Sequence, residues 1–313
     1  MTIRRASLDD SGAISLLFRG RIDVWQRMDA NGRVENVPYE ALTLYERWLH
    51  GGAWMSIETG AIFLNHLLLG AGIPLVALDD AGAGQGKKNI IGYAEAYPGL
   101  EAEPFGSSLH LEHLITSDQS DAGALLTALT DRAKAIKASR VTINRVSQDV
   151  SLPEGYGCKT LSLLRRYTVP ARQGQVFYRS VEHTDPNPAQ ISGWMMPIGR
   201  FTSARHQWEM HMPRLWEAFP RGRKMHRQKF SAAGQEAYVV IEQDMYDVRS
   251  ATVYAWTAKP ITTQTLMAIR DWAHREGYRT LVLAMTDEAA KPLGGEAEAD
   301  TFTQETCAVM TAT

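Results

Sequence analysis

The chain of 313 residues has little that would place it in a specialised class of protein. It contains only two cysteines, Cys158 and Cys307, which are far apart and match no metal-ligand spacing. We therefore expect neither a disulfide framework nor a zinc site. Residues 1–6 lack the apolar core of a signal peptide, and this cysteine usage is typical of a reducing cytoplasm.

The sequence also lacks a long hydrophobic run and a charge excess of either sign. The longest apolar stretch, residues 62–76, is interrupted by Asn65, His66 and Pro74, so we expect no membrane span. A formal net charge of −2 gives no reason to expect nucleic acid as a partner. With 44% hydrophobic and 22% charged residues, the chain has the composition of a globular protein, and its length suggests about two domains.

Hydrophobic periodicity and turn residues predict a mixed arrangement of helices and strands in the first half. Strands are expected at residues 2–5, 74–78, 89–96, 109–116, 140–145 and 158–169, and helices at 13–25, 39–49 and 120–138. Residues 61–69 are largely apolar, apart from Asn65 and His66, which fits either a strand or a buried helix. The strands are joined mostly by hairpins, so the pattern indicates an α/β (α+β) fold with antiparallel pairing.

The second half repeats part of this order after a linker at residues 170–174. A polar-aromatic region reaching to about Gln228 is expected to be helical, and residues 262–276 form an amphipathic helix. Strands are expected at residues 176–181, 237–242, 251–257, 280–285 and 301–310. A strand, a helix of about four turns and another strand occur in both halves. We therefore predict a duplication, with domains at residues 1–170 and 171–313.

The clearest motif is the segment Gln119-Ser120-Asp121-Ala122-Gly123-Ala124, which follows a strand and opens a long helix. Small residues let the backbone approach an anion, and the free N–H groups of a helix start point toward it. The segment resembles the Gln/Arg-x-x-Gly-x-Gly/Ala signature of the GNAT superfamily of CoA-dependent N-acyltransferases, with Ala122 at the central glycine position. The resemblance covers roughly residues 1–170.

This resemblance implies acetyl-CoA as co-substrate and an amine as acceptor. It places the pantetheine alongside Leu114, Ile115 and Thr116, and the diphosphate against Gln119, Ser120, Asp121, Ala122, Gly123, Ala124 and Leu125. It also implies tandem GNAT-like domains, each a mostly antiparallel sheet flanked by helices. The second half has no such loop, since residues 258–262 contain no glycine and Pro260 lacks an N–H donor. We expect that half to shape the acceptor site or to form a homodimer.

Acyl transfer requires a base, and three side chains are candidates. Glu112 and His110 alternate on one face of the strand that leads to the loop, and Glu95 lies on the neighbouring strand. A solvent-facing position is the competing interpretation for the two carboxylates. Residues 147–153 are too short and polar to carry the acid tyrosine of the family. The sequence thus leaves open an N-acetyltransferase and a catalytically inactive CoA-binding or scaffold protein.

Two further signals are given structural interpretations. The basic run at residues 221–229 could contact nucleic acid, but in a chain of net negative charge we interpret it as a solvated surface. His206 and His211 are five positions apart, which puts them on different faces of a helix, so we expect no metal site. The acceptor that the resemblance implies is a small-molecule or peptide amine.

Overall fold

A computed structural model describes residues 1–29, 31–79, 89–117, 119–146, 157–213, 216 and 223–310. The chain divides into two compact units. Unit 1 contains Met1–Tyr97 and Leu111–Ile136, and unit 2 contains Pro98–His110 together with the described residues after Ile136. Within the described ranges, no helix has both the length and the apolar character needed to cross a membrane.

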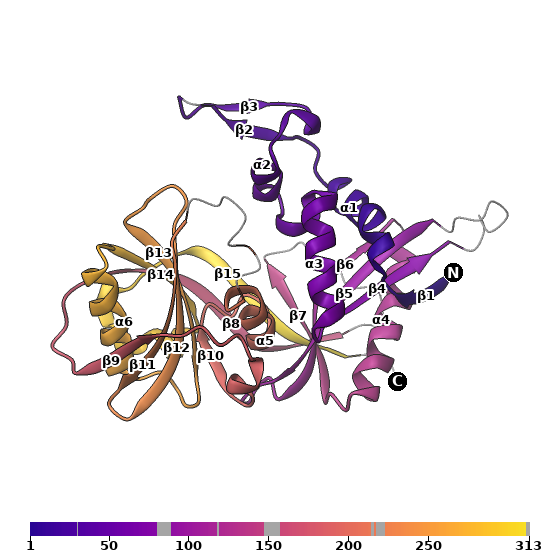
Figure 1. Ribbon diagram of the computed structural model, residues 1–313. Helices are drawn as coiled ribbons and strands as arrows, with labels where there is room; N and C mark the ends of the chain where they lie inside the picture. The colour runs from indigo at the N-terminus through magenta and orange to yellow at the C-terminus, as the bar shows by residue number, and fades with distance from the viewer. Residues whose placement is uncertain are drawn as a thin grey trace. The chain divides into compact units, whose positions relative to one another are not determined.

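Unit 1 has a sheet with the strand order β1-β4-β5-β6 (Figure 1). Its strands are β1 (Thr2–Arg5), β4 (Ile73–Leu78), β5 (Ile90–Leu100) and β6 (Ser107–Thr116), and a separate hairpin pairs β2 (Gln26–Met28) with β3 (Val34–Asn36). Its helices are α1 (Ser11–Arg19), α2 (Leu44–Leu49), α3 (Ile57–Leu69) and α4 (Gln119–Ala135), with 3₁₀ turns η1 (Leu8–Asp10), η2 (Tyr39–Ala41) and η3 (Gly52–Met55). The apolar run 61–69 is therefore helical.

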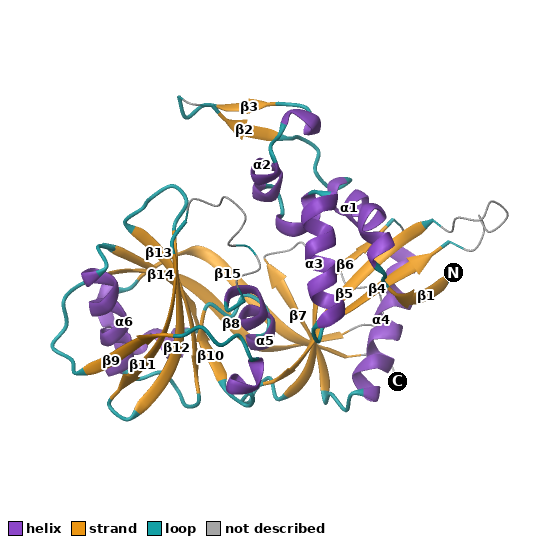
Figure 2. Ribbon diagram, viewed as in Figure 1, coloured by secondary structure: helices purple, strands orange, loops and turns teal. Residues whose placement is uncertain are grey.

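Helices cover both faces of this sheet (Figure 2). A Cβ atom on Gly92 of β5 would lie 3.1 Å from Leu125 Cδ1, so a glycine lets α4 approach one face closely. The next residue, Tyr93, points to the opposite face, where its ring centroid lies 5.1 Å from that of Trp54 in η3 and 5.9 Å from that of Phe18 in α1. The alternation of β5 thus directs small residues to α4 and aromatic residues to α1 and η3.

Unit 2 has the strand order β7-β15-β8-β14-β13-β12-β11-β9, and β10 pairs with β13. Its strands are β7 (Arg140–Val146), β8 (Gly157–Pro170), β9 (Tyr178–Glu182), β10 (Met195–Ile198), β11 (Met225–Ala232), β12 (Gln235–Gln243), β13 (Ser250–Thr257), β14 (Thr280–Met285) and β15 (Glu298–Met310). Its helices are α5 (Ala204–His211), α6 (Thr263–Arg275) and α7 (Asp287–Ala290), with 3₁₀ turns η5 (Pro188–Ile191) and η6 (Lys291–Glu296).

The two predicted halves exchange their last strands. β15, which ends the second half, lies between β7 and β8, with Val309 opposite Val141 and Thr306 opposite Ser162. β8, which ends the first half, pairs in turn with β14, the strand that precedes β15. This reciprocal arrangement fits a duplicated fold and confirms the mixed, largely antiparallel α/β class. The compact units do not follow the boundary predicted at residue 170, which stays a prediction about the repeats.

Two expectations were wrong. The helix predicted to reach Gln228 stops at His211 in α5, and residues 225–232 form β11, which pairs with both β12 and β9. Two sheet neighbours outweigh the weak local preference of this polar segment. Cys158 and Cys307 form a disulfide, with Cα atoms 5.6 Å apart, because β8 and β15 bring together residues 149 positions apart in the sequence.

Candidate functional site

The predicted CoA-binding residues lie at the end of β6 and in the first two turns of α4. Leu114, Ile115 and Thr116 form the last part of β6, and Ile115 is buried in the core. The turn that follows is fixed by Ser117, whose N–H and Oγ both donate to Ile91 O, at 2.9 and 3.1 Å. Asp118 and the side chains of Gln119 and Ser120 lie outside the described residues.

One side of the start of α4 packs on the sheet and another is open. Ala122 and Leu125 are buried, whereas a Cβ atom on Gly123 would meet, among the described residues beyond its own helix backbone and chain neighbours, no atom within 4 Å. Asp121 lies in the first turn, where a carboxylate stabilises the helix dipole. The N–H groups of a first helical turn lack partners within the helix, so this end has the chemistry needed to bind an anion.

Glu95 lies at the centre of a buried cluster in unit 1. Its carboxylate accepts hydrogen bonds from Tyr93 Oη at 2.7 Å, Tyr97 Oη at 2.5 Å and Trp54 Nε1 at 3.2 Å. Glu95 is fully buried, and its two tyrosine partners lie on the same face of β5 because they are two positions away. This excludes the solvent-facing interpretation of Glu95. The sequence analysis missed the cluster, although the Tyr-x-Glu-x-Tyr spacing was a usable signal.

The two phenols of this cluster remain protonated donors. Burial raises the pKa of Tyr93 and Tyr97 well above the usual value, and the charge of Glu95 raises both further. Glu112, half-buried on β6, is near enough to Tyr97 for its charge to add to that increase. Glu95 and Glu112 therefore both raise the pKa of Tyr97. Among the hydrogen bonds described, Tyr97 Oη donates to Glu95.

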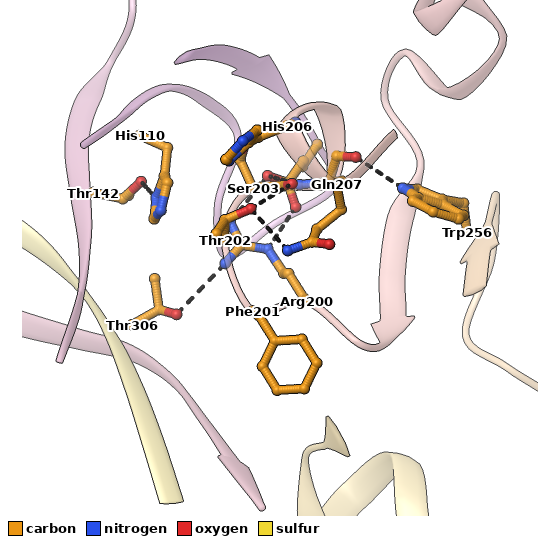
Figure 3. A network of polar contacts seen from close by, with 12 residues as sticks. His110, Thr142, Arg200, Phe201, Thr202, Ser203, His206, Gln207, Trp256 and Thr306 are labelled. Carbon is orange, nitrogen blue, oxygen red and sulfur yellow. Dashed lines mark hydrogen bonds and ion pairs between the residues drawn. The ribbon is translucent and has the colours of Figure 1, made fainter. Parts of the chain in front are cut away.

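His110 points into the interior of unit 2 (Figure 3). It is fully buried, with Nδ1 3.0 Å from Thr142 Oγ1 and Nε2 3.4 Å from Asn144 Nδ2. An amide nitrogen can only donate, so Nε2 accepts and the proton is assigned to Nδ1, which donates to Thr142. With both ring nitrogens engaged in this way, His110 is suited to position its neighbours rather than to take a proton from a substrate.

The network around His110 continues to a buried ion pair. Thr306 Oγ1 donates to Asn144 Oδ1 at 2.6 Å and lies 3.5 Å from Arg200 Nη1. Arg200 donates to both oxygens of Glu101, at 2.7 and 2.9 Å, and both side chains are almost completely buried. Breaking a buried, bidentate pair leaves an uncompensated charge, so this network fixes the segment before α5 against β7 and β15.

In the second half, the turn corresponding to β6–α4 runs from β13 to α6, and it is filled by the chain itself. β13 and β14 pair in parallel only over Ser250–Val253 and Thr280–Leu283. Beyond that point β10 lies between them, since Ile198 pairs with Ala255 of β13 and Gly199 N–H donates to Ala284 O of β14 at 2.7 Å.

The start of α6 is also occupied by groups of the chain. Gln235 Oε1 accepts from Thr262 N–H at 3.3 Å, and Thr262 Oγ1 accepts from Thr265 N–H at 3.2 Å. Gln235 Nε2 donates to the carbonyl oxygens of Lys259 and Pro260. Two of the donors at this helix start, the N–H groups of Thr262 and Thr265, are thus already satisfied by side chains of the protein.

Within the described ranges, no group of three or more His, Cys, Asp and Glu side chains could hold a metal ion. His211 instead lies against the ring of Tyr254, with centroids 4.0 Å apart, and its Nδ1 contacts Gln207 O at 2.7 Å. His206 is buried in α5. These histidines therefore belong to the packing of α5 on the sheet.

Neither a protein-family model nor a curated protein sequence matches the chain. Solved structures do match it over its whole length. A GCN5-related N-acetyltransferase from Anabaena variabilis aligns with a TM-score of 0.58 and 10% identity over 100% of this chain and 73% of that one. A GCN5-related N-acetyltransferase from Kribbella flavida aligns with a TM-score of 0.55 and 10% identity, covering 99% of this chain and 72% of that one. Eis1 from Mycobacterium abscessus aligns with a TM-score of 0.54 and 12% identity, covering 100% of this chain and 74% of that one. The chain therefore has the fold of the GCN5-related N-acetyltransferases, and the match over its whole length is consistent with the tandem GNAT-like domains that the sequence resemblance implied.

Proposed function

We propose that the protein is an N-acyltransferase that moves an acetyl group from acetyl-CoA to an amine, with the acetyl-CoA bound by its first half. The observation that supports this best is the contrast between the two strand–helix turns. The start of α4 is open at Gly123, whereas β10 and Gln235 fill the corresponding turn at β13 and α6. This contrast supports the first turn, rather than the second, as the place where a helix start receives the diphosphate.

In this proposal, the end of β6 and the start of α4 hold the two polar parts of CoA. The backbone of Leu114, Ile115 and Thr116 pairs with the pantetheine amides in the manner of an added strand. The amides of the first turn of α4, which begins at Gln119, bind the diphosphate, and the absence of a side chain at Gly123 leaves room beside them. The second half does not bind CoA, and its role is to shape the acceptor site or to form a homodimer.

The chemistry proposed assigns different tasks to the candidate residues. Glu112, which is half-buried in the middle of β6, takes a proton from the acceptor ammonium. The free amine attacks the thioester carbonyl, the C–S bond breaks, and the surplus proton on the attacking nitrogen passes to the departing sulfur, so that the products are a neutral amide and CoA as the thiol. The backbone N–H of Leu114 or Ile115 polarises the carbonyl. Glu95 and His110 are positioning residues, because their polar atoms are engaged within their own clusters.

The test has two steps, both on the full chain. Calorimetric titration with acetyl-CoA should show saturable binding, and a thiol-release assay over small-molecule and peptide amines should then identify an acceptor. Glu112→Gln should keep the affinity for acetyl-CoA but lower kcat by roughly 100-fold, the usual effect of removing a general base. Glu40→Gln, at an exposed carboxylate of the same unit, is the matched control and should leave both unchanged.

The outcomes separate an enzyme from a binding protein. Absence of heat with acetyl-CoA would contradict the proposal altogether. Binding without thiol release for any amine would instead indicate a catalytically inactive CoA-binding protein. Equal loss of kcat in Glu112→Gln and Glu40→Gln would remove Glu112 as the base.

A further inference from the structure

Unit 2 contains a cavity of about 760 Å³ that the proposed transferase reaction does not use. Its walls come from the turn at residues 102–105, the middle of β8, β10, the last part of the loop before α6, and α7. This volume is within the range of pockets that bind small molecules, roughly 300–1,000 Å³. All of its lining residues belong to unit 2, and none is among the residues proposed to bind acetyl-CoA.

The lining is largely apolar. Its main apolar side chains are Phe105, Leu163, Leu164, Met195, Ile261 and Pro292. Leu163 is 45% exposed, although it lies on a strand with neighbours on both sides. An apolar side chain left accessible in a concave site gains free energy when a ligand removes it from water.

The charged side chains that line the cavity are all compensated by partners of the protein. The pairs are Glu103 with Arg140, Asp287 with Arg165, Glu288 with Lys291, and Arg200 with Glu101. The guanidinium of Arg200 also lies 3.4 Å from the centre of the Phe105 ring, which covers one of its faces. A charged ligand would have to lose its hydration without gaining an unpaired counter-charge, so these pairs favour a neutral ligand.

The position of the cavity explains why it is not a second CoA site. Pro260 and Ile261 line it beside the start of α6, where Gln235 and Thr262 already satisfy donors. β10 forms another wall and lies between β13 and β14. The cavity thus borders a strand–helix turn in which side chains of the protein bind two of the helix-start donors.

We propose that this cavity is a second ligand site, which binds an uncharged, largely apolar small molecule. The affinity of the site comes from the burial of Leu163 and the neighbouring apolar side chains by the ligand. Its charged side chains are already paired within the protein, so the site binds anions and cations less well than neutral molecules. It operates independently of acetyl-CoA.

Nile red, an uncharged apolar dye whose fluorescence rises in apolar surroundings, tests the site in the full chain. One equivalent should bind saturably. The neutral 1-decanol should displace it at a concentration at least roughly tenfold lower than decanoate or decylammonium, because each of these carries a charge into the cavity. Acetyl-CoA should not displace it.

Two pairs of variants locate the bound dye. Ala289→Trp fills the cavity from α7 and should weaken Nile red binding at least roughly tenfold, whereas Ala299→Trp, at an exposed alanine outside the lining, should not. Leu163→Glu should weaken it similarly, and Val248→Glu, at an exposed valine outside the lining, is its control. Melting curves show whether a variant has misfolded. If one lining variant has, the pair that contains the other lining variant decides whether the dye binds in the cavity.

Three results would overturn the proposal. They are the absence of saturable dye binding, wild-type affinity in both lining variants, and displacement by decanoate as readily as by 1-decanol. Displacement by acetyl-CoA would place the dye in the proposed catalytic site instead. A protein that binds the dye but lacks acetyl-CoA turnover would leave this inference standing and contradict only the proposed function.

Discussion

The turns β6–α4 and β13–α6 have the same place in the two repeats but different surroundings. At the first, α4 begins with small residues and an open position at Gly123. At the second, β10 pairs with β13 beyond the point where β13 and β14 separate, and Gln235 binds the start of α6. The comparison shows that one repeat can keep the fold while another part of its own chain packs into the turn between its strand and its helix.

The origin of β10 is visible in the connection that precedes each first helix. Between β1 and α1 the chain has only residues 6–10, which are all described and form a single 3₁₀ turn, η1. Between β9 and α5 it has residues 183–203, which form η5 and β10. Added length in one surface connection, which costs little free energy, supplies the strand that fills the second turn.

The central strands of the two sheets differ in a related way. If Tyr93 of β5 is matched with Tyr238 of β12, Glu95 corresponds to Val240. Both positions are fully buried, but one holds a carboxylate with three donors and the other an aliphatic side chain. A buried carboxylate costs free energy to desolvate, so its presence in only the first repeat points to a task beyond packing.

The largest expected effect separates these two positions. Glu95→Ala should lower the free energy of unfolding by about 3–5 kcal/mol, because two phenols and an indole N–H lose their buried acceptor. Val240→Ala should cost only about 2 kcal/mol, the loss of two buried methyl groups. Urea denaturation at neutral pH measures both. Equal costs would show that the Glu95 cluster adds no stability beyond packing.

The next effect concerns the strand that fills the second turn. Gly199 follows β10 with φ of +77°, and a Cβ atom there would lie 2.8 Å from Val253 O. Gly199→Ala should therefore lower the free energy of unfolding by about 3 kcal/mol, from backbone strain and displacement of β10.

Gly193→Ala is the matched control for this substitution. Gly193 has nearly the same φ, +78°, but no atom lies within 4 Å of its Cβ position. It should cost only about 1 kcal/mol, from strain alone. Thermal melting compares the two, and a cost for Gly193→Ala as large as that for Gly199→Ala would show that close packing of β10 is unimportant.

A third prediction tests which turn binds acetyl-CoA. Gly123→Trp should weaken acetyl-CoA binding by roughly 100-fold, about 2.7 kcal/mol, because the indole would occupy the open side of α4. Met267→Trp, at the fifth residue of α6 as Gly123 is of α4, should leave the affinity unchanged. Calorimetric titration of both variants with acetyl-CoA measures these affinities. Weaker binding in Met267→Trp with unchanged binding in Gly123→Trp would instead place the site in the second repeat.

Much of this fold could be predicted from local patterns. The period of two at residues 109–116 and the amphipathic helix at 262–276 are strong signals, and both elements are present. β11 was missed because its polar residues have no strong local preference, and its two neighbours in the sheet decide its structure. The disulfide was missed because only the exchange of last strands brings Cys158 near Cys307.

The candidate site was less accessible to sequence reasoning. The residues from Leu114 to Leu125 were chosen from a motif, and they stay predictions until a ligand is measured. The partners of Glu95 include Trp54, 41 positions earlier, so no local pattern could reveal that the carboxylate is buried. His110 illustrates the opposite case, since strand alternation placed it correctly but could not show that Thr142 and Asn144 engage its ring.

The smallest expected effect is a difference between the units in how stability depends on pH. Burial lowers the pKa of His183 and of His226 in unit 2, so the folded unit binds fewer protons there than the unfolded chain. Their contribution to stability is complete above the ordinary histidine pKa of about 6.5, and is lost as the pH falls below it. Unit 2 should therefore begin to lose stability just below that pH.

In unit 1, Asp10 provides the contrast. Burial opposes its ionisation, but hydrogen bonds from Arg4 and Ser7 outweigh this and hold its pKa below the usual value. A carboxylate of this kind stabilises the unit above the ordinary aspartate pKa of about 3.9 and loses that effect only in stronger acid.

Hydrogen exchange resolved by mass spectrometry at pH 7, 6 and 5, corrected for the intrinsic exchange rate, should detect this difference. Protection of β11 should fall before that of β1. The double variant His183→Gln with His226→Gln should flatten the response of β11, whereas His274→Gln, at an exposed histidine of the same unit, should not. A loss of protection in β1 that begins at the same pH would show that the two histidines do not set the first acid-sensitive step.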